Sequence, residues 1–203
     1  MSETAVRKGV KTRQIFMEAG RRVFARDGYL NAEISEIARE AGKSNGTFYI
    51  YFENKSALLD AMIEEFDRYI DSRLATNADA WYGASKAGDW KTIVAKLWET
   101  FKLHAPTLHA LSQAAFVDEH FAGLYQKKRA RTRADFVVFL KSQQQHGYCT
   151  GANIQLVAAA LETMTSACMD EWLTENGKPL DRREEKKALA TLTQIFTAVM
   201  TME

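Results

Sequence analysis

The sequence predicts an all-α fold built from about nine helices. Three observations support this prediction. Apolar residues recur at intervals of three and four along nearly the whole chain, which is the spacing that lines one face of a helix. No run of residues alternates between apolar and polar as a half-buried strand would. The chain has only two prolines, and its sparse glycines fall mostly between the periodic segments.

Glycines separate the first three expected helices. Gly28 ends the first helix and Gly42 ends the second, because glycine readily adopts the left-handed conformation that stops a helix. The third helix is short, and Ser44 is suited to cap its first turn. The expected ranges are 12–27, about 34–41, and from Ser44 or Asn45 to Tyr51.

The remaining helices are longer. Asn54 is a good N-cap for the fourth helix, and Pro106 suits the first turn of a later one. We expect a loop over the polar stretch 82–89 and a turn at Gly177 to Pro179. The expected ranges are 54–78, 90–104, 106–117, 120–146, 153–174 and 181–200.

The composition is that of an ordinary globular protein. Apolar residues make up 46% of the 203 residues and charged residues 26%, which argues against long disorder. The two cysteines, Cys149 and Cys168, cannot build a disulfide framework. The first residues form no signal peptide, and no stretch reaches roughly 18 consecutive apolar residues. We therefore expect a soluble cytoplasmic protein with no role in a membrane.

The charge is distributed unevenly although the net charge is only +1. Residues 1–55 carry ten Lys and Arg against seven Asp and Glu, a net of +3, and residues 56–203 carry 17 against 19, a net of −2. The basic excess lies at the N-terminal end, as expected if that end meets a polyanion.

Residues 34–55 have the size of a helix-turn-helix, with Gly42 in the turn between two short helices. Phe48 and Phe52 are expected in a small core with the first helix. Three hydroxyls of the second short helix could instead donate to phosphate oxygens, and Gly46 allows another surface to approach its backbone. The hydroxyl residues are Thr47, Tyr49 and Tyr51.

Lys55 stands in the first turn of the fourth helix, where the helix dipole disfavours a cation by a few tenths of a kcal/mol. A phosphate at that helix end would meet the exposed N–H groups and the lysine together. The position therefore suggests that Lys55 binds phosphate.

The sequence resembles the TetR family of bacterial transcription regulators over about residues 12–62. The resemblance is carried by IFMEAGRRVFARDGY, then ISEIAREAG, then SNGTFYIYFENKSALL, in this order and spacing. It implies a DNA-binding domain over residues 1–54 and a larger helical domain over 55–203 that binds an effector and dimerises. It also implies a double-stranded DNA operator as partner, read by two recognition helices of a homodimer in successive major grooves. The implied DNA contacts are Lys43, Ser44, Asn45, Gly46, Thr47, Tyr49, Tyr51 and Lys55.

The sequence departs from the family pattern in three places. Asn31, Ala32 and Glu33 replace the usual hydroxyl residues before the second helix, so Asn31 is expected to supply the cap. Lys43 stands where an apolar residue is usual and either lies along the surface or adds a DNA contact. Asn45 stands where lysine is common. The operator sequence of another family member therefore does not carry over.

The resemblance implies a small-molecule effector, for which we expect a hydrophobic or aromatic compound. The candidate pocket residues are Tyr69, Trp98, Phe101, His104, Leu108, Leu111, Phe116, Tyr125, Phe136, Met164 and Cys168. The last two amphipathic helices pair either within one chain or, as the resemblance favours, across a homodimer. The candidate interface residues are Val157, Leu161, Trp172, Leu189, Leu192, Phe196 and Val199.

Other function classes have weaker support. Residues 126–133, QKKRARTR, are either a solvated helix face or a site for an anionic ligand. No catalytic motif and no metal-ligand spacing occurs, so we expect no enzyme activity, no cofactor and no metal site. The leading interpretation is a repressor that its effector releases from a palindromic operator. An activator with the same DNA contacts, or a helical sensor or interaction protein that no longer reads DNA, stays open.

Overall fold

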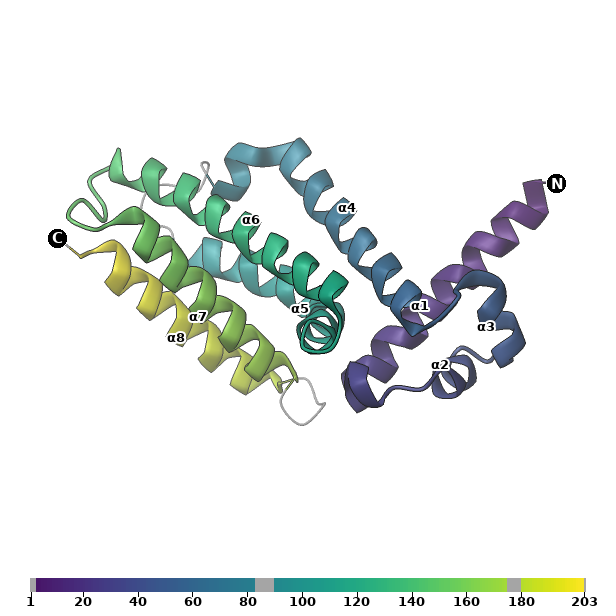
Figure 1. Cartoon of the computed structure of the whole chain (residues 1–203). Helices are drawn as coiled ribbons and strands as arrows, with labels where there is room; N and C mark the ends of the chain where they lie inside the picture. The colour runs from purple at the N-terminus through teal and green to yellow at the C-terminus, as the bar shows by residue number, and fades with distance from the viewer. Residues whose placement is uncertain (1–2, 83–89, 175–179, 203) are drawn as a thin grey trace. The chain divides into compact units, whose positions relative to one another are not determined.

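The computed structural model describes residues 3–82, 90–174 and 180–202, and within these ranges the chain forms eight helices and no strand (Figure 1). The all-α prediction is confirmed. The loop expected over 82–89 does not begin at Tyr82, which is still helical, and its remaining residues and the turn at Gly177 to Pro179 lie outside the described residues. The helices are α1 (Glu3–Asn31), α2 (Ile34–Glu40), α3 (Asn45–Tyr51), α4 (Lys55–Tyr82), α5 (Trp90–Ala114), α6 (Glu119–Gln144), α7 (Ile154–Thr174) and α8 (Arg182–Met200).

The expected helix boundary at Pro106 is wrong, because α5 continues through this residue. Proline removes one backbone hydrogen bond from a helix interior, but its fixed φ is itself helical. Buried residues lie on both sides of it, among them Val94 and Trp98 before it and Leu111 after it. The described residues therefore contain eight helices where about nine were expected.

Gly28 interrupts α1, as the sequence predicts, with φ 73° and ψ 162°. This conformation is nearly restricted to glycine. A Cβ atom at this position would also come within 2.9 Å of the Gln113 side chain. Gln113 Oε1 accepts a hydrogen bond of 2.6 Å from the backbone N–H of Tyr29, directly after the interruption. The glycine thus permits both the turn of the chain and the close approach of Gln113.

The chain divides into two compact units. The first contains the described residues up to Arg68 together with Pro106–Ala122. The second contains Tyr69–Ala105 and the described residues from Gly123 onward. Three helices, α4, α5 and α6, contribute residues to both units.

Aromatic side chains form the core of the first unit. Phe16 of α1 and Phe48 of α3 are fully buried, and their rings meet edge to face at 5.4 Å. A Cβ atom at Gly20 of α1 would lie 2.8 Å from Leu58 of α4, so the absence of a side chain lets these two helices pack closely. This packing gives α3 a rigid support.

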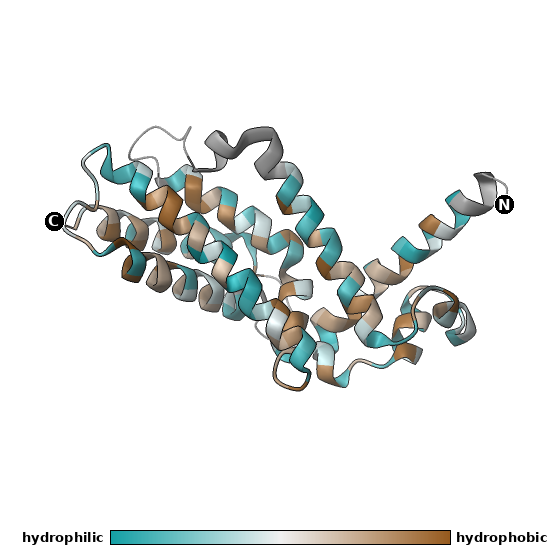
Figure 2. Cartoon of the chain, turned by 45° about the horizontal axis from the view of Figure 1, so that its top comes forward, coloured by the Kyte–Doolittle hydropathy of each residue, from teal (hydrophilic) through white to brown (hydrophobic). Residues whose placement is uncertain are grey.

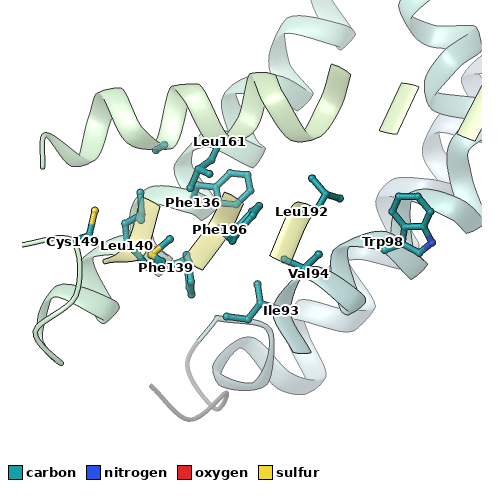
Figure 3. Close-up of a cluster of buried hydrophobic side chains, with 12 residues drawn as sticks. Ile93, Val94, Trp98, Phe136, Phe139, Leu140, Cys149, Leu161, Leu192 and Phe196 are labelled. Atoms are coloured by element: carbon teal, nitrogen blue, oxygen red, sulfur yellow. The ribbon is translucent and has the colours of Figure 1, made fainter. Parts of the chain in front are cut away.

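The core of the second unit is a cluster of buried side chains from α5, α6, α7 and α8, with Cys149 from the segment between α6 and α7 (Figure 3). Along the helices of this unit, brown hydrophobic and teal hydrophilic stretches both occur (Figure 2). No described helix has a stretch that is both long and apolar enough to span a membrane.

Candidate DNA-binding interface

The turn between α2 and α3 is a Schellman motif. Gly42 has φ 62°, its N–H donates to the Arg39 carbonyl at 3.0 Å, and the N–H of Lys43 donates to the Ala38 carbonyl at 2.9 Å. A Cβ atom at Gly42 would meet nothing within 4 Å, so glycine is favoured there by its backbone conformation. The turn fixes the direction in which α3 leaves α2 through backbone bonds alone.

Ser44 caps α3, as its position predicts. Its Oγ accepts a hydrogen bond of 3.2 Å from the N–H of Thr47 and lies 2.9 Å from Thr47 Oγ1. Asn54 likewise caps α4, with Oδ1 accepting from the N–H of Ala57 at 2.8 Å. The hydroxyls of Ser44 and Thr47 are therefore part of the local structure of the turn.

Asn31 does not cap α2, contrary to expectation. Its amide nitrogen donates to the Asp27 carbonyl at 3.2 Å and so remains with α1. Glu33 occupies the N-cap position of α2 and makes no side-chain cap bond. Because Gly28 turns the chain within α1, Asn31 at the end of this helix reaches back to Asp27 instead of forward to α2.

The surface of α3 opposite the buried Phe48 carries the exposed side chains. Gly46, Tyr49 and Ile50 are spaced i, i+3, i+4 and share this surface, and Asn45 is exposed beside them. We call these four residues the reading face. The structure thus brings together three of the expected DNA contacts and adds Ile50.

Two other expected DNA contacts on α3 are only partly exposed to solvent. Thr47 and Tyr51 are half-buried, and the ring of Tyr51 lies 6.1 Å from that of Phe16. Lys43, in the turn before α3, is exposed. Ile50 was missed because an isoleucine in a short helix suggests core. The sequence did contain a signal for its exposure. Ile50 lies two residues after Phe48, a spacing that turns it well away from that buried side chain in a helix.

Lys55 makes three hydrogen bonds to backbone carbonyls at the end of α1 and beyond. Its Nζ lies 2.6 Å from the oxygen of Tyr29, 3.3 Å from that of Leu30 and 3.0 Å from that of Ala32, and 4.6 Å from the centre of the Tyr29 ring. Burial lowers the pKa of Lys55, and the nearby Glu33 opposes this shift. An ammonium group has three N–H donors, and all three have partners here. This geometry ties α4 to the α1–α2 connection.

Arginine residues of α1 and α2 are paired with carboxylates of the same unit. Arg22 Nε lies 2.6 Å from Glu40, and Arg26 makes bonds of 2.9 and 2.7 Å to Asp27. Arg39 pairs with Glu36. Much of the basic charge that the sequence places before residue 55 is thus balanced locally.

The expected pocket residues are divided between the two units. Leu108, Leu111 and Phe116 belong to the first unit, and Phe116 is 88% exposed because it follows the end of α5. In the second unit, the rings of Tyr69 and His104 lie 4.7 Å apart, and the Arg129 guanidinium lies 5.9 Å from the Tyr125 ring. The others belong to the buried cluster or pack against it: Trp98, Phe101, Phe136, Met164 and Cys168.

The expected interface residues face the interior of their own chain. Leu161, Leu192 and Phe196 are buried in the cluster of the second unit. Val157, Trp172, Leu189 and Val199 are partly buried against it. The apolar surfaces of α5 and α6 cover these side chains within the chain, and their part in a homodimer stays a prediction.

Arginines of the basic run 126–133 also have intramolecular partners. Arg129 binds both oxygens of Glu162 at 2.7 and 2.8 Å, and Arg131 lies 2.6 Å from Asp71. Arg133 reaches Glu162 at 3.5 Å. Burial alone would raise the pKa of Glu162, but the hydrogen bonds and charges of the arginines outweigh it and lower the pKa. The sequence signal for this network was Glu162, an acidic residue on an otherwise apolar face of α7, which is buried in the structure.

Comparison with known proteins agrees with this architecture. Residues 16–62 match the family model described as "Bacterial regulatory proteins, tetR family". The chain is 36% identical over 59 residues to an uncharacterized HTH-type transcriptional regulator, YdgC, of Bacillus subtilis, covering 29% of this chain and 30% of that protein. It is 39% identical over 49 residues to the Bacillus subtilis fatty acid metabolism regulator protein, covering 24% of this chain and 25% of that one. The match thus spans less than a third of either relative.

The fold of the whole chain is also known. A putative transcriptional regulator from Saccharomonospora viridis, solved in complex with choline, superposes with a TM-score of 0.72 over 96% of this chain and 100% of that one. The two sequences are 18% identical, so this likeness concerns the fold alone.

Proposed function

We infer that this chain, which matches the tetR family of bacterial regulatory proteins over residues 16–62, is a DNA-binding transcription regulator of the cytoplasm that acts as a homodimeric repressor. A small hydrophobic or aromatic effector releases it from a palindromic operator. The observation that carries the proposal is the reading face, held outward on α3 by the Schellman turn and the buried Phe48. A rigid helix with exposed polar and apolar groups is what the major groove accepts.

The proposed DNA contacts are the exposed residues Lys43, Asn45, Gly46 and Tyr49. Ser44, Thr47 and Tyr51 contribute through their hydroxyls at the edges of this surface. Lys55 acts by holding the α1–α2 connection in place. A contact between Lys55 and a phosphate is the alternative, and the salt dependence of DNA binding distinguishes the two roles.

The proposed dimer uses the outer surfaces of α7 and α8, which run beside each other (Figure 1). On α7 the exposed positions include Leu156, Ala160 and Thr163, and on α8 Thr197 and Ala198. From Ala188 to Met202 the sequence contains no charged residue. Depletion of charge is typical of the centre of a protein interface, and a two-fold dimer matches a palindromic operator.

The effector is proposed to bind in the second unit, whose interior is mostly apolar. Polar groups are also present there. Gln143 is buried, and its Oε1 has no hydrogen-bond partner among the described residues. A buried acceptor without a partner costs about 1–3 kcal/mol, so an apolar compound that carries a hydrogen-bond donor would suit this interior. Release of DNA requires the effector to bind more tightly to the state that does not bind DNA.

Selection from a pool of random DNA duplexes tests the proposal. The full-length protein should enrich a palindromic sequence and shift it as a dimer in gel electrophoresis. A variant with Asn45→Ala and Tyr49→Ala should lose this binding, while Val138→Ala, an exposed substitution on α6, should retain it. Absence of binding at low salt would contradict the proposal and favour a helical sensor that no longer reads DNA. The observation that favours this alternative is Glu33, which occupies the N-cap position of α2 without a side-chain cap bond. A reporter gene behind the selected sequence distinguishes repression from activation.

A further inference from the structure

The recognition helix α3 carries no charged residue. Its sequence is NGTFYIY, from Asn45 to Tyr51. The nearest charged side chains, Lys43 and Glu53, lie outside the helix on either side, and both are exposed. Any base that α3 itself reads must therefore be recognised by an amide, a hydroxyl or an apolar group.

This set of groups matches one kind of base pair. Guanine is most often read in the major groove by Arg or Lys, and the amino group of cytosine by Asp or Glu. Adenine is read by the bidentate amide of Asn or Gln, and thymine by apolar contact with its methyl group. The helix offers the groups for adenine and thymine and lacks the charged groups for guanine and cytosine.

Ile50 is the most exposed apolar side chain of this helix. It is 76% exposed, whereas Phe48, two residues earlier, is fully buried. Gly46 lies one turn before Ile50 on the same face, and a Cβ atom there would meet only Ser44 Oγ, at 3.8 Å. The surface around Ile50 is therefore open enough for the edge of a base pair to approach its methyl groups.

We propose that α3 reads A·T base pairs in the major groove, with Asn45 bonded to an adenine and Ile50 in contact with the methyl group of a thymine. This proposal rests on the proposed function and adds which base pairs the helix selects. Asn45 lies five residues before Ile50 on the exposed side of α3, so the two side chains contact different positions within one half-site.

The test removes one methyl group at a time from the selected duplex. Each thymine is replaced by deoxyuridine, which lacks only the C5 methyl group, and the Kd of the full-length protein is measured. One such replacement, in one of the two half-sites, should weaken wild-type binding by roughly four-fold, as expected for loss of one buried methyl group. Ile50→Ala should bind the unmodified duplex more weakly and should lose the sensitivity to this replacement, since the two changes remove the same contact.

Val117→Ala is the matched control, because Val117 is also a β-branched residue, is 65% exposed and belongs to the same unit. It should respond to deoxyuridine as the wild type does. A selected half-site with G·C pairs at its core, or equal deoxyuridine sensitivity in wild type and Ile50→Ala, would overturn this proposal and leave the proposed function intact. If no sequence is enriched at all, the proposed function itself fails.

Discussion

Replacement of Lys55 by methionine tests what this lysine does. Methionine keeps the length of the side chain and removes its three donors, so the carbonyls of Tyr29, Leu30 and Ala32 lose their Nζ partner. The bond to Leu30 is exposed and water replaces it, whereas the other two are partly buried. An unsatisfied buried acceptor costs about 1–3 kcal/mol, and the contact with the Tyr29 ring adds about 0.5–1 kcal/mol.

The expected loss for Lys55→Met is about 2–3 kcal/mol, because the new side chain still packs and water reaches part of the site. For a protein of this size that corresponds to a fall in Tm of roughly 5–10 °C. If Lys55 holds the structure and does not bind phosphate, the affinity for DNA decreases while the slope of log K against log salt stays unchanged. A direct phosphate contact would instead reduce that slope by about 0.9 for each subunit of the bound dimer.

Lys43→Met is the control for Lys55→Met, because Lys43 is exposed in the turn and makes only backbone bonds there. It should leave Tm unchanged and reduce the salt slope. The measurements are thermal unfolding by circular dichroism and a salt titration by fluorescence anisotropy. A Lys55→Met protein that melts like the wild type and shows a smaller salt slope would refute the structural role and establish the phosphate role predicted from the sequence.

Three further substitutions have definite expectations. Gly28→Ala should destabilise the protein by about 1–3 kcal/mol, because its φ and ψ are almost restricted to glycine; a thermal melt equal to wild type would contradict this. The hydrogen bond with Asp60 raises the pKa of His120 above 6.5. Its contribution to stability is therefore present below pH 6.5 and is lost as pH rises through the raised pKa, and His120→Asn should flatten this dependence in urea unfolding. Glu162→Ala should cost about 2–4 kcal/mol, because it leaves Arg129 without its buried partner; denaturant midpoints unchanged from wild type would show that the pair contributes nothing.

Local signals predicted the local structure well. Ser44, Asn54 and Gly28 act over a few residues, and each does in the structure what its position predicts. Pro106 shows the limit of such rules, since the helix continues through it and the fixed φ of proline is itself helical. Asn31 shows the same limit, because the direction of the chain after Gly28 decides which helix it can reach.

Contacts between distant segments were harder to predict. Lys55 meets carbonyls 23 to 26 residues earlier, and no local pattern marks that pairing. The periodicity of α7 and α8 correctly indicated an apolar face, but periodicity does not identify the partner of that face. Leu161 and Leu192 are buried within the chain because α5 and α6 provide matching surfaces. Three of the four residues of the reading face were predicted from the sequence. Ile50 was missed because the exposure of a side chain cannot be read directly from its residue type.

The Schellman turn at Gly42 separates what this domain needs for folding from what it needs for recognition. Backbone hydrogen bonds of the turn set the direction of α3 relative to α2, and the buried side chain of Phe48 packs α3 against the core of the unit. The hydrogen bonds of the turn and of the helix cap come from residues other than the four of the reading face. Residues 45, 46, 49 and 50 can therefore be exchanged on an unchanged frame, so the exposed surface of this short helix can vary while the fold of the domain is kept.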